Sequence, residues 1–251
     1  MTNRKSANTT AGAEKPLKGH VALITGGSRG IGKAIAGKLA HLGAAISICG
    51  RDTAALESTA ASLRHSTQHV HWQTADATRA SDVASLVRAT EEKLGPITIL
   101  VNNVGIGNPG FGSIQEKSES DWDRVLDTNL KSVFLVSTAV APLMIERRRG
   151  DIINISSLAG KNTFAGGALY CASKWGLQGL AGCMAEDLRP FGIRVSVICP
   201  GSVFTDFSGR GPKDPTKVLT ADDVAHAVAM VAMQGSQSFI SEVHLRPLFR
   251  P

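Results

Sequence analysis

From residue 20 onward the chain alternates short apolar runs with longer stretches whose apolar positions recur at helical spacing. The short runs, bounded by turn residues, predict strands, and the longer ones predict amphipathic helices. The predicted strands span residues 20–25, 45–49, 69–73, 97–101, 151–155, 194–198 and 239–245. The predicted helices span residues 30–42, 53–63, 80–94, 120–146, 168–189 and 222–233.

The regular alternation of strand and helix predicts a parallel sheet with helices on both faces. The strands are continuously apolar, as expected for strands that are buried on both sides. We therefore expect an α/β protein with a single-domain, Rossmann-type, doubly wound parallel sheet of about seven strands. No linker or repeat divides residues 19–251, and the polar residues 1–18 are expected to form a mobile tail.

Composition and charge change this picture little. A length of 251 residues and 43% hydrophobic content suit one soluble domain. The net charge of +6 comes partly from residues 1–18 and partly from arginines 147–149, where a predicted helix ends and cations are favoured. Because the chain has neither a broad basic face with aromatic residues nor an apolar run of membrane-spanning length, we expect no nucleic-acid or membrane partner. Four separated cysteines favour reduced thiols and a cytoplasmic location. His69 and His71 share one strand face without further ligands, so no metal site is expected.

A glycine-rich segment, TGGSRGIG at residues 25–32, joins the first predicted strand to the first predicted helix. Glycines permit a tight turn and a close approach of a phosphate, and the free N–H groups at a helix start favour an anion. Glycine-rich turns are common, but the strand before this one and the helix after it favour a nucleotide site over a purely structural turn.

The end of the second predicted strand indicates which nucleotide is bound. An NAD site often carries an acidic residue there, whereas the 2′-phosphate of NADP needs a cation. Gly50 occupies the position expected to be acidic, Arg51 follows it, and Arg29 lies in the glycine loop. Both arginines favour NADP(H), since a guanidinium binds phosphate through two parallel hydrogen bonds, although either could be an ordinary surface charge. Asp52 is better explained as the N-cap of the next helix.

Polar residues also follow the third and fourth predicted strands. Asp76 could accept a hydrogen bond from the adenine amino group, or it could be a turn residue. Asn103, in the segment NNVG at 102–105, could serve the nucleotide site or tie strands together.

Three residues of the second half indicate a reaction centre. Ser157 follows the fifth predicted strand, and Tyr170 and Lys174, spaced i and i+4, share one face of the following helix. Ketone reduction needs a hydride on carbon and a proton on oxygen. Tyrosine is a weak acid–base catalyst at its usual pKa of about 10, but a nearby ammonium lowers that pKa. We expect Tyr170 to be the general acid/base and Ser157 to polarise the carbonyl.

With these motifs the chain resembles the short-chain dehydrogenase/reductase family over roughly residues 18–245. The resemblance rests on TGGSRGIG, Asp76, NNVG, Asn129 within DTNL, Ser157, YCASK at 170–174, and PG at 200–201 followed by Thr205. It implies that Asn129 holds a water that relays protons to Lys174, and that Thr205 binds the nicotinamide carboxamide. It also implies a homotetramer or dimer built through the helices around 120–146 and 168–189. The implied cofactor site comprises Gly26, Ser28, Arg29, Gly30, Ile31, Gly32, Arg51, Asp76, Ala77, Asn103, Val104, Gly105, Tyr170, Lys174, Pro200, Gly201, Val203 and Thr205.

The expected function is therefore NADP(H)-dependent hydride transfer between the nicotinamide and a small carbonyl compound or secondary alcohol. The C-terminus, FISEVHLRPLFRP, lacks the glycine-rich segment with an acidic residue that many members carry. This departure favours a broad ketone or hydroxy-acid substrate; reduction of a 3-oxoacyl thioester on an acyl carrier protein stays open. A non-catalytic NADP-binding sensor or scaffold is a third hypothesis, disfavoured because all four reaction residues are present. An apolar substrate pocket could be lined by Phe111, Phe164, Phe204 and Phe207.

Overall fold

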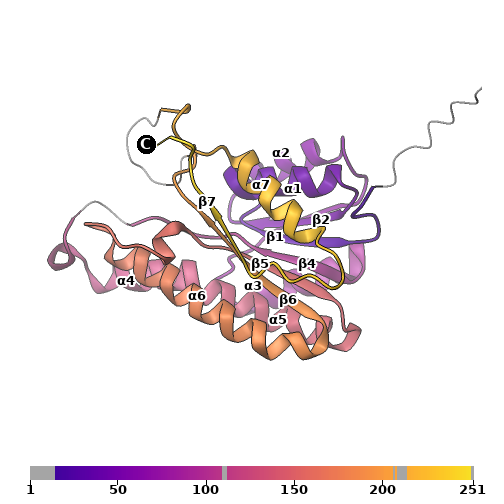
Figure 1. Ribbon diagram of the computed structural model, residues 1–251. Helices are drawn as coiled ribbons and strands as arrows, with labels where there is room; N and C mark the ends of the chain where they lie inside the picture. The colour runs from indigo at the N-terminus through magenta and orange to yellow at the C-terminus, as the bar shows by residue number, and fades with distance from the viewer. Residues whose placement is uncertain (1–14, 109–111, 206, 208–213, 250–251) are drawn as a thin grey trace, which may run out of the picture.

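The sheet is parallel and runs through the middle of the protein (Figure 1). The computed structural model describes residues 15–108, 112–205, 207 and 214–249. In this part of the chain the strand order is β3-β2-β1-β4-β5-β6-β7, so the winding direction reverses between β1 and β4, as in the doubly wound fold. The strands are β1 Val21–Thr25, β2 Ala45–Gly50, β3 Val70–Thr74, β4 Ile97–Asn102, β5 Gly150–Ile155, β6 Ile193–Pro200 and β7 Glu242–Leu245.

Helices cover both faces of the sheet (Figure 1). One face carries α1, α2 and α7, and the opposite face carries α3, α5 and α6. The helices are α1 Gly30–His41, α2 Thr53–Leu63, α3 Ala80–Leu94, α4 Glu119–Leu126, α5 Ser132–Arg147, α6 Ala168–Leu188 and α7 Ala221–Ala232. The expected fold class is confirmed.

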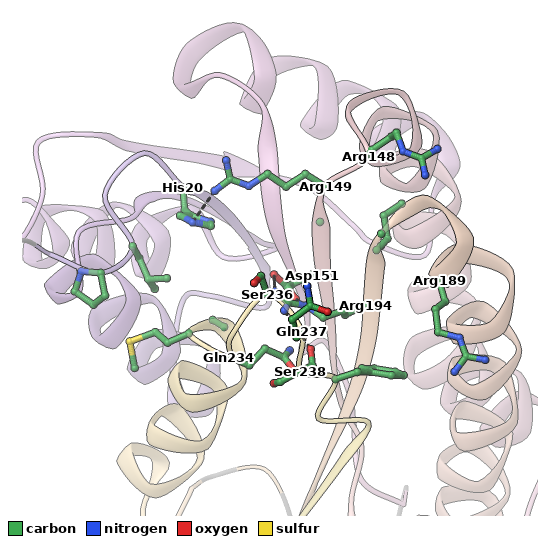
Figure 2. A pocket seen from close by; sticks show the side chains of 18 residues that line it. His20, Arg148, Arg149, Asp151, Arg189, Arg194, Gln234, Ser236, Gln237 and Ser238 are labelled. Carbon is green, nitrogen blue, oxygen red and sulfur yellow. Dashed lines mark hydrogen bonds and ion pairs between the residues drawn. The ribbon is translucent and has the colours of Figure 1, made fainter.

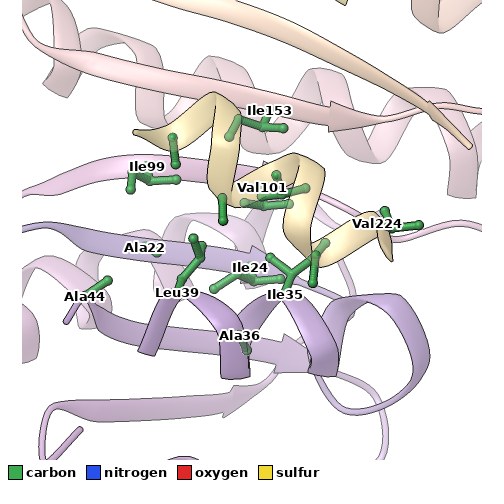
Figure 3. Close-up of a cluster of buried hydrophobic side chains, with 14 of the residues drawn as sticks. Ala22, Ile24, Ile35, Ala36, Leu39, Ala44, Ile99, Val101, Ile153 and Val224 are labelled. Atoms are coloured by element: carbon green, nitrogen blue, oxygen red, sulfur yellow. The ribbon is translucent and has the colours of Figure 1, made fainter. Parts of the chain in front are cut away.

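The core beneath α1 and α7 fixes the glycine loop in place. Figure 3 shows Ile35 and Leu39 of α1 packed on Ile24 of β1, with Val224 of α7 beside them. All four of these side chains are fully buried. Full burial of such a side chain stabilises the fold by about 1.5–3 kcal/mol. The first turn of α1 is thereby held against the carboxyl end of β1, where the glycine loop lies.

The prediction of one long α-helix over residues 120–146 is wrong in one respect, because a π-helical turn interrupts it. Between α4 and α5 lies a π-helical turn, Asp127–Lys131, which contains the buried Asn129. The apolar spacing continues on both sides of the turn, so periodicity could not reveal it. Single π-turns within helices often occur at functional sites.

The stretch Glu119–Arg147 is also long and apolar enough to cross a membrane, judged by length and composition alone. Its apolar residues have another use in this fold. Val136 and Val140 of α5 are buried in the core against the sheet. Of the most apolar window of the stretch, 39% is buried inside the protein.

The ends of the chain differ slightly from expectation. Of the expected tail, residues 1–14 lie outside the described part, but Leu17 is buried and its N–H donates to the carbonyl of Leu42 at 2.9 Å. The last strand is shorter than predicted and begins at Glu242.

Candidate active site

The glycine loop joins β1 to α1 at the carboxyl edge of the sheet. Gly26 and Gly30 have φ angles of 64° and 53°, in the left-handed region that favours glycine. A Cβ on Gly32 would lie 2.2 Å from the carbonyl oxygen of Gly26, so the helix start sits directly on the loop. Arg29, the N-cap of α1, makes no side-chain cap hydrogen bond, which leaves the first N–H groups to a ligand. Ile31 packs on the core from the same turn. The loop fits a nucleotide pyrophosphate.

Asn103 holds the glycine loop to β4. Its Nδ2 donates to the carbonyl oxygens of Thr25 and Gly26 at 3.0 and 3.2 Å. Its backbone N–H and that of Val104 both donate to the Thr25 hydroxyl, at 3.0 and 3.2 Å. The structural interpretation of Asn103 therefore has direct support, because the side chain positions the loop.

The residues expected to bind the 2′-phosphate lie where β2 ends. The hydroxyl oxygen of Ser28 is 3.3 Å from the position that a Cβ on Gly50 would take, so the glycine loop and the strand end face each other. Arg29 and Arg51 are both exposed. Asp52 accepts a hydrogen bond from the N–H of Ala55 at 3.0 Å, which confirms its N-cap role.

Asp76 is partly committed to a turn. Its Oδ1 accepts hydrogen bonds from the N–H and the hydroxyl of Thr78, at 3.0 and 2.8 Å. Burial alone would raise the pKa of Asp76, but the Thr78 bonds and the charges of Arg51 and Arg79 hold it below its usual value. Ala77 beside it is buried in the core. The structure therefore supports the interpretation of Asp76 as a turn residue. The charge of Arg51 also helps to lower the pKa of its carboxylate.

Ser157 and Tyr170 meet at the carboxyl end of β5. The Tyr170 hydroxyl is hydrogen-bonded to Ser157, whose oxygen also accepts from the N–H of Ala159 at 3.1 Å. The Ser157 hydroxyl donates to the carbonyl of Pro200 at 3.4 Å, which links β5 to the end of β6. A serine and a phenol are thus placed together, as the spacing predicts.

Lys174 does not lower the pKa of Tyr170 in this structure, so that expectation is corrected. Its Nζ lies 5.8 Å from the centroid of the Tyr170 ring and donates to the carbonyl of Ile155 at 2.9 Å. Burial raises the pKa of Tyr170 to about 12, and the Ser157 hydrogen bond lowers it only in part. Burial likewise lowers the pKa of Lys174 to about 8. Desolvation is therefore the largest cause of both pKa shifts.

Asn129 projects from the π-turn toward Lys174. Its Oδ1 accepts from the N–H of Ile106 at 2.7 Å, and its Nδ2 donates to the carbonyl of Ile106 and to Ser173 Oγ, at 2.9 and 3.0 Å. A Cβ on Gly105 would lie 3.3 Å from Asn129 Oδ1 and 3.7 Å from Lys174 Nζ. The structure therefore brings Asn129, Lys174 and Gly105 together.

The segment after β6 lies against β7 and the glycine loop. The N–H of Gly201 donates to the carbonyl of Leu245 at 2.8 Å, and Val203 forms an isolated bridge with Leu219. The methyl carbon of Thr205 lies 3.6 Å from the position that a Cβ on Gly30 would take. Thr205 therefore faces the glycine loop.

Phe207 stands over the reaction centre. Its ring lies edge-on to that of Tyr170, with centroids 6.1 Å apart and an interplanar angle of 61°. Phe164 and Phe204 are exposed, and Phe111 lies outside the described residues. Among the described residues, Phe207 is thus in ring contact with Tyr170.

Sequence reasoning missed Asn108, which holds the start of α6. Its Oδ1 accepts from the N–H of Tyr170 at 2.9 Å, and its Nδ2 donates to the carbonyl of Gly166. Because 62 positions separate Asn108 from Tyr170, no local pattern could have revealed the contact.

A group of three residues between β6 and β7 was also missed. Cys199, Glu242 and His244 place one ligand atom each within 4.8 Å of one another, a spacing that could hold a metal ion. The Nζ of Lys161 is 2.9 Å from Glu242 Oε1, so the carboxylate is already paired with a cation. The group ties the last strand to the turn that follows Ser157.

Comparison with known proteins agrees with this geometry. The family model described as short chain dehydrogenase matches residues 20–215, which is more than half of the chain. The chain belongs to the short-chain dehydrogenase family. This family binds a nicotinamide cofactor and acts on small molecules as an oxidoreductase.

Several relatives of this short-chain dehydrogenase have named activities. A 2-(S)-hydroxypropyl-CoM dehydrogenase of Xanthobacter autotrophicus is 37% identical over 194 residues, which cover 77% of this chain and 75% of the relative. A ketoacyl reductase named for the granaticin polyketide synthase of Streptomyces violaceoruber is 39% identical, over 83% of this chain and 76% of the relative. The crystal structure of a metagenomic short-chain oxidoreductase in complex with NADP is 40% identical, with a TM-score of 0.82 over 94% of this chain and all of that one.

Proposed function

We propose that this protein is an NADP(H)-dependent oxidoreductase that interconverts a ketone and a secondary alcohol. The proposal rests on the convergence of Ser157, Tyr170, Lys174 and Asn129 at the sheet edge that carries the glycine loop. Ligands of doubly wound sheets bind at this edge.

Each residue has a role that follows from its contacts. When NADP(H) is bound, its nicotinamide would supply a hydride to the substrate carbon or accept one from it. Ser157 donates a hydrogen bond to the substrate carbonyl oxygen and so polarises it. Tyr170 gives its hydroxyl proton to that oxygen, and burial keeps the phenol protonated at neutral pH because its pKa is about 12. Lys174 and Asn129 replace the proton on Tyr170, the role that the family resemblance assigns to them.

The test of this mechanism removes only the phenolic hydroxyl. Tyr170→Phe keeps the ring contact with Phe207 and is expected to lower turnover by roughly 10²–10⁴-fold, the usual contribution of general acid catalysis, while NADPH still binds. Consumption of NADPH with a panel of ketones would be followed by its absorbance. Retained turnover in Tyr170→Phe would refute the role of Tyr170.

Preference for NADP(H) is supported by Gly50 and Arg51 at the end of β2, by Arg29, and by the NADP in the related crystal structure. A charge-assisted contact to the 2′-phosphate contributes about 1.5–3 kcal/mol, or roughly 10- to 150-fold in affinity. Arg51→Asp should therefore weaken NADPH binding by this factor and leave NADH binding nearly unchanged. Equal losses for both nucleotides would remove Arg51 from the 2′-phosphate site.

For the substrate we propose a broad ketone or hydroxy-acid type. The atypical C-terminus supports this choice. So does the relative named 2-(S)-hydroxypropyl-CoM dehydrogenase, since that name describes a secondary alcohol. The ketoacyl reductase among the relatives favours a 3-oxoacyl thioester as the second candidate. Comparing kcat/KM for simple ketones with that for 3-oxoacyl thioesters decides between them. Tight NADPH binding without turnover of either class would favour a non-catalytic sensor or scaffold.

A further inference from the structure

In the described part of the chain, the last strand, β7, lies at one edge of the sheet beside β6 (Figure 1). A charged group anchors the segment that leads into β7. Arg194 of β6 donates to the carbonyls of Gly235 and Ser238, at 3.0 and 3.3 Å. The same guanidinium binds both oxygens of Asp151, at 2.6 and 2.9 Å (Figure 2). The strand itself is anchored at its carboxyl end by a chemically different group.

This second group consists of Cys199 on β6 with Glu242 and His244 on β7. Cys199 and His244 are partners in the parallel ladder, and Glu242 lies two residues before His244. All three side chains therefore project from the same face of the sheet. Cys199 is fully buried, whereas the side chains of Glu242 and His244 are 30% and 43% exposed. One ligand atom of each residue lies within 4.8 Å of the other two. The register of the two strands brings these atoms together.

Three groups converge on a single oxygen of Glu242. Lys161 Nζ, His244 Nε2 and Cys199 Sγ lie 2.9, 3.0 and 3.3 Å from its Oε1. A carboxylate oxygen has about two lone-pair sites, so it cannot bond well to three hydrogens. Two of the three groups, the thiol and the imidazole, become metal ligands when their protons are removed. A divalent ion in place of those protons would bind the oxygen, the nitrogen and the sulfur at once.

The distances within the group suit tetrahedral zinc. Zinc binds sulfur at about 2.3 Å and nitrogen or oxygen at about 2.0–2.1 Å, so tetrahedral angles separate sulfur from oxygen by about 3.5 Å and nitrogen from oxygen by about 3.3 Å. The corresponding distances in the structure are 3.3 and 3.0 Å. The third pair, the sulfur and the imidazole nitrogen, lies within 4.8 Å and has an ideal separation of about 3.6 Å. Rotation of the partly exposed His244 side chain can close this gap.

We propose that Cys199, Glu242 and His244 bind one zinc ion, which clips β7 to β6. Sulfur and imidazole ligands select zinc over magnesium and calcium, which take oxygen ligands. The thiol proton is released to solvent on binding, and a water completes the tetrahedron on the exposed side of the group. The site uses none of the residues assigned to the nucleotide or to the reaction, so it does not depend on the proposed function.

Gln178 of α6 holds the sulfur in position. Its Nε2 lies 3.1 Å from Cys199 Sγ and 3.0 Å from Ser156 Oγ, so the amide can donate to the sulfur while it is tied to the end of β5. Hydrogen bonds of this kind orient the ligands of metal sites. The sulfur is thus supported from the side of α6 and faces Glu242 on the other side.

Lys161 competes with the ion for Glu242. Its ammonium is paired with Oε1, but its side chain is 34% exposed and can turn toward solvent when an ion takes its place. A unit charge about 4 Å from a divalent ion weakens binding at least about tenfold, even at the dielectric constant of water. Lys161 therefore sets how tightly the site binds zinc, and its removal should strengthen binding.

The experiment titrates the full-length, tag-free, reduced and metal-free protein with Co²⁺, which takes the place of zinc and reports its own ligands. We expect saturation at one equivalent, the intense visible bands of a tetrahedral ion, and the near-ultraviolet charge-transfer band of a cobalt–thiolate bond. Added Zn²⁺ should displace the cobalt and remove both sets of bands. A spectrum without the charge-transfer band, or one with the weak visible bands of an octahedral ion, would overturn the proposal.

Matched variants locate the ion. Cys199→Ser should lose the charge-transfer band, whereas Cys183→Ser, at an exposed cysteine of α6, should keep it. His244→Gln should weaken Co²⁺ binding more than tenfold, whereas His226→Gln, at an exposed position of α7, should leave it unchanged. The opposite result in either pair would place the metal elsewhere and refute the site. If the buried change Cys199→Ser prevents folding, the exposed pair His244→Gln and His226→Gln decides the question.

The competitor gives a test in the opposite direction. Lys161→Met should bind Zn²⁺ at least about tenfold more tightly than the wild type, measured by competition with Co²⁺. Lys33→Met, at an exposed position of α1, removes the same charge from the protein and should leave the affinity unchanged. Unchanged or weaker binding in Lys161→Met would mean that the ion does not lie at Oε1 of Glu242, and would contradict the proposal.

Discussion

Replacing Gly32 with alanine tests whether the close approach of α1 to the glycine loop maintains the nucleotide cradle. The added Cβ would lie 2.2 Å from the carbonyl oxygen of Gly26 and 2.5 Å from Nδ2 of Asn103. Non-bonded atoms are most stable at separations of about 3.5–4.0 Å, so the helix or the loop must move by roughly 1 Å. This movement pulls apart the hydrogen bond between Asn103 and Gly26.

The magnitude can be worked out from these contacts. Overpacking costs about 1–3 kcal/mol, and the lost hydrogen bond costs about 1 kcal/mol. Alanine in a helix returns about 0.5–1 kcal/mol relative to glycine. The free energy of unfolding should therefore fall by about 1–3 kcal/mol, and NADPH affinity should fall with it because the phosphate-binding N–H groups are displaced.

Gly37→Ala provides the control, since Gly37 lies in the same helix and a Cβ there would meet nothing within 4 Å. It should raise the free energy of unfolding by about 0.5–1 kcal/mol and leave NADPH binding unchanged. Urea unfolding followed by circular dichroism measures stability, and quenching of protein fluorescence measures NADPH binding. If Gly32→Ala matched Gly37→Ala in both measurements, the proposed tight packing of helix on loop would be wrong.

Three further predictions concern the reaction centre and the surface. In steady-state assays, Asn108→Ala should lower kcat more than it raises KM for the substrate, because Asn108 positions the start of α6. Asn108→Asp keeps the acceptor for the Tyr170 N–H and should restore kcat. Alcohol oxidation needs the phenolate of Tyr170, whose pKa is about 12. The oxidation rate should therefore rise about tenfold per pH unit between about pH 7 and 9, while the reduction rate stays nearly flat. A pH-independent oxidation rate would refute this assignment. Trp175 on α6 and Phe134 on α5 are each 50% exposed. If these helices form the expected oligomer, Trp175→Asp should reduce the mass measured by light scattering. The surface change Arg88→Gln should leave that mass unchanged.

Much of the fold could be predicted because its causes are local. Continuous apolar runs such as β1 and β4 are buried on both faces, and the periodic apolar positions of α1 meet the sheet as expected. The π-turn at Asn129 escaped prediction because it leaves the apolar pattern intact. It depends on the contacts of the Asn129 amide with Ile106, which is distant in sequence.

The residues of the candidate site likewise divide into those that could be predicted from the sequence and those that could not. Residues that follow strand ends, such as Ser157 and Asn103, could be placed because the topology of a parallel sheet brings strand ends together. Asn108 and the Lys161–Glu242 ion pair could not, because they join loops whose approach depends on the whole fold.

The i, i+4 spacing of Tyr170 and Lys174 placed both side chains on one face, but it could not say where the ammonium goes. In the structure Nζ is bound to the carbonyl of Ile155, and burial shifts the pKa values of both groups toward their neutral forms. A neutral phenol is a suitable proton donor for reduction and a poor base for oxidation. The protonation states of Tyr170 and Lys174 are thus set mainly by burial, which is a property of the folded site and not of the spacing.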